Sequence, residues 1–260
     1  MTTPLPAGSS SISDMPTDGC TALSHLTPSS SYLAQNWDWL EEQQRNLILL
    51  TIKQRSKPTI KMMTEAGIIG KIGLNSSGVG VCLNAIRATG MDATRMPVHL
   101  ALRAVLESTS LAAAGNELEK HGVASACHML IADGEGSIGL EWSCKELVKV
   151  EMDEKKEVVH SNHYLLPHEV KEANGWVDSP FRFERMTELA SSLGQNATVE
   201  DVVELFKDEK NSPASICRKQ EGASTAATLF NIVMELKARR ARVKMGRPTE
   251  GGEEVEIAFF

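Results

Sequence analysis

The sequence predicts an α+β fold in which helices cover largely antiparallel sheets. Two observations support this: strand-like stretches occur in runs, and helix-like stretches occur in pairs between those runs. A parallel sheet needs a crossover, usually a helix, between successive strands, so grouped runs favour antiparallel pairing and separate layers. The 260 residues, of which 42% are hydrophobic, are sufficient for a large buried core.

The first run of strands is predicted in an aliphatic and glycine-rich region. NLILLTIKQ (46–54) is continuously rich in aliphatic residues, which is typical of a buried strand, and TIKMMTEAG (59–67) follows Pro58 as its hairpin partner. Residues 68–85 combine many glycines with alternating apolar residues. They predict two strands joined by the turn-forming sequence Asn-Ser-Ser-Gly at 75–78.

Two helices and a second run of strands follow. PVHLALRAVLEST (97–109) and SLAAAGNELEKHG (110–122) carry apolar residues at helical spacing. Pro97 suits the first turn of the first helix, and Gly122 suits the end of the second. Further strand patterns lie at 125–133, 137–143 and 156–165.

A second helix pair and a final run of strands complete the pattern. FRFERMTELASSL (181–193) has helical spacing and stops at Gly194. ATVEDVVELFKDE (197–209) begins with Thr198, followed three residues later by Asp201, which is an acidic variant of the capping box. The final strands are predicted at 227–238, 241–247 and 254–260.

Charge and hydropathy argue against two classes of partner. The net charge of −7 disfavours nucleic-acid binding, and the one basic run, KARRARVKMGR (237–247), has the alternating apolar residues of a strand with solvated charges. No apolar run approaches the ~18–20 residues that a membrane span needs. The N-terminus lacks the basic and apolar regions of a secretory signal. We therefore expect no nucleic-acid partner and no membrane partner.

The cysteines indicate an intracellular chain with reduced thiols. They are odd in number and scattered, and none forms a C-x-x-C pair, so we expect no structural zinc and no other metal site. The chain ends in EIAFF, which is not a peroxisomal address of the S-K-L type, so a cytoplasmic location is expected. The five cysteines are Cys20, Cys82, Cys127, Cys144 and Cys217.

Cys20 stands at a change in composition. Residues 1–19 are rich in Pro, Ser, Thr and Gly and predict a flexible segment, whereas residues 20–260 predict the folded domain. A cysteine nucleophile needs a base, because its thiol ionises near pH ~8.5. His25 is five residues away, which on an extended strand is the opposite face from Cys20.

A different base becomes available if the chain is cut before Cys20. The new α-amine would have a pKa of ~7.7–8 and would lie within reach of its own thiol. Gly19 suits such a cut, because the thiol can approach its carbonyl carbon without meeting a Cβ. The simpler alternative is a turn with a packed thiol, which is the commoner fate of a cysteine in this setting.

Several long stretches from Cys20 onward resemble a known family. They are DGCTA (18–22), AQNWDW (34–39), PTIKMMTEAGIIGKIGLNSSGVGVCLNA (58–85), ALRAVLESTS (101–110), VVHSNHYLL (158–166), PASICR (213–218) and ATLFNIV (227–233). In this order, and over about residues 18–250, the chain resembles the fungal acyl-coenzyme A:isopenicillin N (6-aminopenicillanate) acyltransferases. These belong to the N-terminal-nucleophile hydrolase superfamily.

The resemblance implies a fold and a reaction. The fold is a four-layer αββα sandwich, and the reaction begins with an autocatalytic cut between Gly19 and Cys20. An acyl group then passes from acyl-coenzyme A, which is a substrate rather than a bound cofactor, through an acyl-cysteine to a β-lactam amine in penicillin biosynthesis. Amidohydrolase activity accompanies this transfer. A heterodimer of the chain's own cleavage fragments is the expected assembly, and the other partners are the small-molecule substrates.

The resemblance also assigns residues. Cys20 matches the nucleophile, Asp38 the aspartate near the cysteine's amine, Asn162 the oxyanion-hole asparagine, and Ser224 a serine that the family needs for activity. Asp38 would orient the amine and stabilise its protonated form, and Asn162 would donate to the tetrahedral oxyanion. In strand-like VVHSNHYLL an asparagine is otherwise disfavoured, whereas its neighbouring histidines are expected to be packed and structural.

The chain departs from the family at two places. Thr225 stands where the family has an arginine near the nucleophile, and threonine supplies no cation for a substrate carboxylate or for cysteine activation. The family also carries a long, mostly helical segment before the nucleophile, which becomes the small subunit. Residues 1–19 would be the remnant of that segment, and residues 1–16 do not resemble it.

Two other functions remain open from the sequence. The same nucleophile would suit an amidohydrolase acting on another small amide or peptide. A catalytically weak or silent paralogue, kept as a binding or regulatory protein, is the alternative from a different class. A fragment that begins at Cys20 would separate the enzymes from the silent paralogue.

Overall fold

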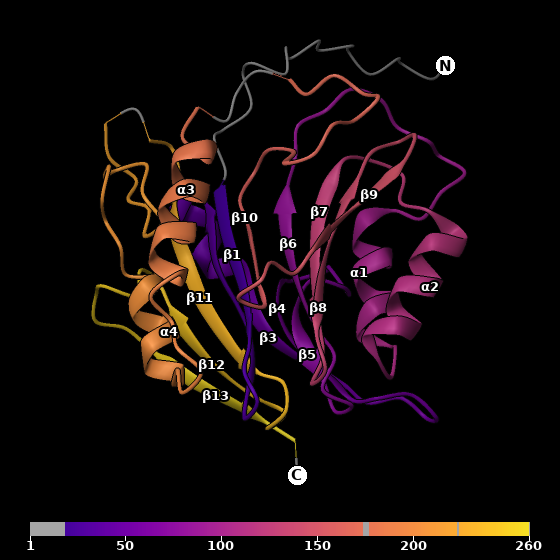
Figure 1. Ribbon diagram of the computed structural model, residues 1–260, viewed down its shortest axis with the longest axis horizontal. Helices are drawn as coiled ribbons and strands as arrows, with labels where there is room; N and C mark the ends of the chain where they lie inside the picture. The colour runs from indigo at the N-terminus through magenta and orange to yellow at the C-terminus, as the bar shows by residue number, and fades with distance from the viewer. Residues whose placement is uncertain (1–18, 174–176, 223, 260) are drawn as a thin grey trace, which may run out of the picture.

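Two antiparallel sheets lie face to face between two pairs of helices. The computed structural model describes residues 19–173, 177–222 and 224–259. In Figure 1, α3 and α4 cover the outer face of one sheet, and α1 and α2 cover the outer face of the other. Every strand pairing within the two sheets is antiparallel. The predicted α+β class and its αββα layering are confirmed.

The first sheet combines strands from both ends of the chain. Its order is β10-β1-β2-β11-β12-β13. The bounds are β1 Gly19–Leu26, β2 Ser31–Trp39, β10 Glu157–His160, β11 Ala227–Glu235, β12 Arg240–Met245 and β13 Glu254–Ala258. Strand β1 pairs with β2 from Gly19 onward and with β10 at Ala22–His25, so strands from separate parts of the chain flank it.

The second sheet is a meander in sequence order from β3 to β9. The bounds are β3 Leu47–Ile52, β4 Ile60–Glu65, β5 Ile72–Asn75, β6 Gly80–Ala85, β7 Cys127–Ala132, β8 Ser137–Trp142 and β9 Leu147–Glu151. A short 3-10 helix, η2 (Glu41–Asn46), precedes β3. Short turns join most of these strands, so local sequence signals were sufficient to predict most of this sheet.

The four helices lie where the sequence predicts, with ends that differ from the predicted ones by one to four residues. They are α1 Val98–Leu106, α2 Leu111–His121, α3 Ser179–Ala190 and α4 Val199–Leu205. Pro97 precedes α1, and Gly122 ends α2 with a φ of 64°, a conformation that favours glycine. Thr198 and Asp201 form a complete capping box at the start of α4.

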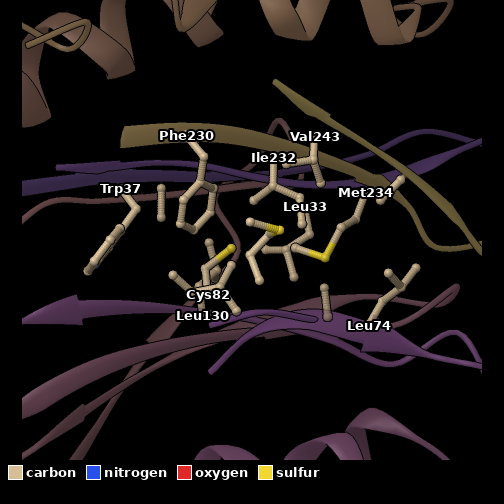
Figure 2. Packing of buried hydrophobic residues seen from close by; sticks show 14 of the residues in the cluster. Leu33, Trp37, Leu74, Cys82, Leu130, Phe230, Ile232, Met234 and Val243 are labelled. Carbon is tan, nitrogen blue, oxygen red and sulfur yellow. The ribbon is translucent and has the colours of Figure 1, made fainter. Parts of the chain in front are cut away.

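The main hydrophobic core lies between the sheets. Figure 2 shows Phe230, Ile232 and Met234 of β11 pointing toward Leu74 and Leu130 of the facing sheet. Alternate residues of each strand face this core, while the others face the helices. This arrangement also places the side chain of Cys20 in the inter-sheet cluster.

Two predictions about strands need correction, and some strands were missed. The strand predicted as buried at 46–54 is β3, an edge strand whose Ile48 and Leu49 are 39% and 40% exposed. The strand predicted at 156–165 ends at His160, so Asn162 lies in the following loop. Strands β1, β2 and β9 were not predicted. A continuous apolar run cannot distinguish an edge strand from a central one, because pairing is decided by the rest of the sheet.

None of the helices in the described parts of the chain is long and apolar enough to cross a membrane. The predicted flexible segment at 1–19 lies outside the described residues, except for Gly19.

Candidate active site

Cys20 is the second residue of β1 and is 3% exposed. In the β1–β2 ladder Gly19 faces Asp38, and Cys20 faces Trp37. The backbone N–H of Cys20 donates to Asn162 Oδ1 over 2.9 Å. The fold therefore brings Cys20 together with two other residues that the sequence assigned to the site: Asp38 from the neighbouring strand, and Asn162 from a distant loop.

Asp38 is a fully buried carboxylate on β2. Its Oδ1 accepts from Thr228 Oγ1 at 2.7 Å, and Arg218 Nε lies 3.7 Å from its Oδ2. Oδ2 has no hydrogen-bond partner among the residues that the structure describes. Burial raises the pKa of Asp38 to about 6, and the nearby Arg218 and Arg182 oppose that rise. Asp38 is therefore poised to change its charge near neutral pH.

Asn162 is held in one orientation by its neighbours. Its backbone N–H donates to Ser179 Oγ at 2.6 Å, and its Nδ2 donates to the carbonyl of Ala85 at 3.0 Å. Its Oδ1 accepts from Cys20 and, at 2.7 Å, from Arg182 Nη2. The Nδ2 group carries a second hydrogen, so it retains one donor for a developing oxyanion.

Arg182 is a site residue that sequence reasoning missed. It lies on α3 with no exposed surface, and its guanidinium spans the start of β1. Nη1 donates to the carbonyl of Cys20 at 2.6 Å and to Thr21 Oγ1 at 3.0 Å. Its spacing in the sequence could have indicated that it is buried. It stands three residues after buried Ser179 and four residues before buried Met186, on the same face of α3. A buried arginine on such a stripe needs partners, and here they are the backbone and side chains of the site.

Asp178 links Arg182 to a second buried arginine, Arg218. Asp178 Oδ2 accepts from Arg182 Nε at 2.9 Å and from Arg218 Nη2. Burial alone would raise the pKa of Asp178, but the two guanidiniums outweigh it and hold that pKa below its usual value. Asp38, Asp178 and the two arginines thus form a charge-balanced chain beside Gly19 and the backbone of Cys20. The stretch PASICR contained Arg218, but nothing in its local pattern indicated a site role.

Gly19 is closely surrounded by this chain of charges. A Cβ at residue 19 would lie 2.9 Å from Asp38 Oδ2 and 3.1 Å from Arg218 Nε. The residue before the nucleophile therefore has no room for a side chain.

Ser224 and Thr225 lie in the segment that leads into β11. Ser224 is 8% exposed, and its Oγ donates to the carbonyl of Ala226 at 3.1 Å, while Thr225 is exposed. A cation is present in the site as Arg218, which is 1% exposed and whose Nε lies 3.7 Å from Asp38 Oδ2. The preceding residue, 223, lies outside the described residues.

Three histidines near the site have polar partners within the fold. His160 Nε2 lies 2.8 Å from Glu141 Oε1, and His163 Nδ1 lies 2.8 Å from Ser179 Oγ. His25 pairs with Glu157 at 2.9 Å, and it lies on the opposite face of β1 from Cys20. No group of three or more His, Cys, Asp or Glu residues within 19–173, 177–222 and 224–259 could hold a metal ion.

Comparisons with solved structures show the same fold. Penicillin V acylase from Agrobacterium tumefaciens aligns with a TM-score of 0.65 at 12% identity, covering 92% of this chain and 86% of the acylase. A single-residue variant of conjugated bile acid hydrolase from Clostridium perfringens aligns with a TM-score of 0.62 at 15% identity, covering 93% of this chain and 97% of the hydrolase. The fold is therefore of the N-terminal-nucleophile type.

Comparisons of sequence are more specific. An acyl-coenzyme A:6-aminopenicillanic-acid-acyltransferase, 40 kDa form, from Emericella nidulans is 43% identical over 246 residues, which cover 93% of this chain and 68% of that protein. The sequence profile of acyl-coenzyme A:6-aminopenicillanic acid acyltransferases matches residues 25–250. That span includes Asp38, Asn162 and Ser224. With the fold, the buried site and the sequence in agreement, the chain belongs to the acyl-coenzyme A:6-aminopenicillanic acid acyltransferase family.

Proposed function

We propose that this protein moves an acyl group from acyl-coenzyme A, through a thioester on Cys20, to the amine of 6-aminopenicillanate or to isopenicillin N. Self-cleavage between Gly19 and Cys20 precedes this transfer, and amide hydrolysis accompanies it. The observation that carries the proposal is the hydrogen bond from the Cys20 backbone N–H to the buried Asn162 amide. After cleavage that nitrogen would be the α-amine, already held beside its own thiol.

The cleavage step uses groups that meet at Gly19. The Cys20 thiol attacks the carbonyl carbon of Gly19, a C–S bond forms, and the amide C–N bond breaks as the nitrogen takes up a proton. Water then hydrolyses the thioester and leaves a carboxylate on Gly19 and a free thiol and amine on Cys20. Arg182 holds the carbonyl of Cys20 throughout, because its contact lies on the side of the bond that stays with the nucleophile.

The transfer step repeats this attack on an external thioester. The Cys20 amine accepts the thiol proton, and the sulfur attacks the acyl carbonyl of acyl-coenzyme A. Coenzyme A leaves as its thiol, and the acyl-cysteine is then attacked by the β-lactam amine, or by water in the hydrolytic reaction. Asn162 Nδ2 supplies a hydrogen bond to the oxyanion, and such a donor is typically worth ~10²–10³ in rate.

A second candidate keeps the fold and the nucleophile but changes the acceptor. The exposed Thr225 stands where the family has an arginine, and threonine supplies no cation for a substrate carboxylate. This difference favours a substrate other than the family's β-lactam. In that case the protein would be an amidohydrolase on another small amide or peptide.

The test is intact mass combined with turnover. We expect the 28.3 kDa chain to yield a fragment that begins at Cys20, and the processed protein to transfer phenylacetyl from phenylacetyl-coenzyme A to 6-aminopenicillanate. Hydrolysis of a simple acyl-amide without transfer would favour the second candidate.

Cys20→Ala removes the sulfur on which both steps depend. We expect it to abolish cleavage and transfer and to leave the circular dichroism spectrum unchanged. The control is Cys127→Ala, another buried thiol, which lies in the cluster beneath α1 and α2 and should keep both activities. Transfer by the Cys20→Ala protein would overturn the nucleophile assignment.

A further inference from the structure

The loop that carries Asn162 is tied to one buried carboxylate. Glu141, on β8, has no exposed surface, and its two oxygens face four groups at residues 160–168. These are His160 Nε2 at 2.8 Å, the Leu165 N–H at 2.6 Å, the Leu166 N–H at 3.3 Å and His168 Nε2 at 3.3 Å. These groups come before and after Asn162 in the sequence, so this one carboxylate joins the two ends of the loop.

The His160 contact extends to the residue before Asn162. His160 is the last residue of β10, and its Nδ1 lies 2.8 Å from the carbonyl of Ser161. Both ring nitrogens thus face oxygen atoms, which holds the ring in one orientation between Glu141 and the Ser161 carbonyl. His128 stacks on this ring at 3.5 Å, and burial together with His160 lowers the pKa of His128.

A buried carboxylate with polar partners contributes little net stability, because the cost of desolvating its charge offsets the attraction of those partners. Its effect on geometry is larger. Asn162 must meet Cys20 N, Arg182 and Ala85 at once, and a displacement of about 1 Å at such a point can cost ~10²-fold in rate. A loop without regular structure needs an external anchor to reach that accuracy.

We propose that Glu141 is a positioning residue that holds residues 161–168 so that the Asn162 amide stays aligned on Cys20. The inference rests on the proposed function for its kinetic readout. Its structural readout, the order of the loop, does not depend on that function.

The chain offers a matched control for Glu141→Gln. Glu157 is also a buried carboxylate, 5% exposed, and also pairs with a histidine, His25, at 2.9 Å. Its partner lies on the opposite face of β1 from Cys20. We expect Glu141→Gln to lower the rate of cleavage and the kcat of transfer at least ~10-fold with KM changed less than ~2-fold. Glu157→Gln should keep both rates within ~2-fold at a comparable loss of melting temperature. Equal losses of kcat in the two variants, or a normal kcat in Glu141→Gln, would overturn the proposal.

A second measurement follows the loop directly. In a Cys20→Ala background, amide hydrogen exchange of a peptide covering 161–168 should be at least ~10-fold faster with Glu141→Gln than with Glu157→Gln. Unchanged exchange would overturn the anchoring role even if catalysis were lost. Glu141→Asp keeps the charge but is one methylene shorter, so it serves if the glutamine variant does not fold, and the same direction of change is expected.

These readouts separate two failures. If the wild-type protein neither cleaves nor transfers, the proposed function fails, and exchange alone decides the role of Glu141. If the wild-type protein is active and only the exchange changes, the function stands and the positioning role fails.

Discussion

At the scale of single residues, the site is built from buried charges that constrain one another. Asp178 accepts from both Arg182 and Arg218, and Arg182 in turn holds the carbonyl of Cys20 and the amide of Asn162. Each side chain has few positions open to it, because moving one leaves a buried charge without its partner. The nucleophile is therefore held in a site whose geometry is set before any substrate arrives.

Gly19 is the residue at which this rigidity has its clearest consequence. Gly19→Ala would place a Cβ within 2.9 Å of Asp38 Oδ2, whose carboxylate is fixed by Thr228. We expect self-cleavage to slow at least ~10-fold, because the scissile carbonyl must shift away from the thiol. The time course of fragment formation by mass spectrometry measures this.

The control for Gly19→Ala is Gly115→Ala on α2, where a Cβ would meet no atom within 4 Å. It should cleave at the wild-type rate and gain about 0.5–1 kcal/mol of stability from the better helix former. Equal cleavage by both variants would show that the space at Gly19 does not matter.

Asp38 gives the protein a specific pH dependence. Burial raises its pKa to about 6, so the folded state holds this proton more tightly than the unfolded state, whose pKa is near 3.8. As the pH rises through this interval, ionising Asp38 costs the folded state stability, and the loss is complete above about pH 6. We expect Asp38→Asn to melt at a higher temperature than wild type at about pH 7.5 and to differ little near pH 4.5, while losing cleavage. Thermal unfolding at several pH values measures the difference. A constant offset at every pH would contradict the buried-carboxylate account.

At the scale of elements, local sequence signals fix the helix ends that frame the site. The Thr198–Asp201 capping box satisfies two backbone N–H groups at the start of α4. Helix α4 packs its buried Val202 and Leu205 into the cluster beneath the first sheet. The cap therefore stabilises the helix layer without touching the nucleophile.

Thr198→Ala should cost about 1 kcal/mol of unfolding free energy, because it removes the side-chain acceptor of the cap. Urea denaturation measures the loss, and acyl transfer should stay at the wild-type level. Thr198→Ser keeps the hydroxyl and should lose only a few tenths of a kcal/mol. A loss as large in the serine variant as in the alanine variant would mean that the methyl group, not the cap, carries the effect.

At the scale of the whole molecule, the inter-sheet core joins segments from opposite ends of the chain. Strand β11 pairs with β2, and its side chains fill the space toward the second sheet (Figure 2). The start of β1 pairs with β2, and its later residues Ala22–His25 pair with β10. The stability of the site thus depends on the contact between the sheets.

Ile232→Ala tests that dependence. Ile232 is fully buried in the inter-sheet cluster, so its truncation should cost about 2–5 kcal/mol through lost burial and an unfilled cavity. Ile69→Ala, at a residue that is 50% exposed, should change stability by less than about 0.5 kcal/mol. Chemical denaturation compares the two. A small loss of unfolding free energy in Ile232→Ala would show that the two sheets move together and fill the cavity.

Local sequence patterns were enough to specify the fold class, the helix ends and most hairpins of the second sheet, because periodicity, turn residues and caps act over a few neighbouring residues. They also indicated Cys20 and Gly19 through their place at a change in composition. The resemblance to a family added Asp38, Asn162, Ser224 and Thr225, whose roles remain proposals.

Long-range packing, in contrast, set which strands enclose the nucleophile and which charges meet there. It placed β3 at a sheet edge, ended β10 before Asn162, and brought Arg182 and Arg218 together on Asp178. Most of these contacts join residues that are far apart in the chain, and no local pattern encodes such a pairing. They form because packing α3 against the outer face of the first sheet buries charged side chains, and buried charges need partners.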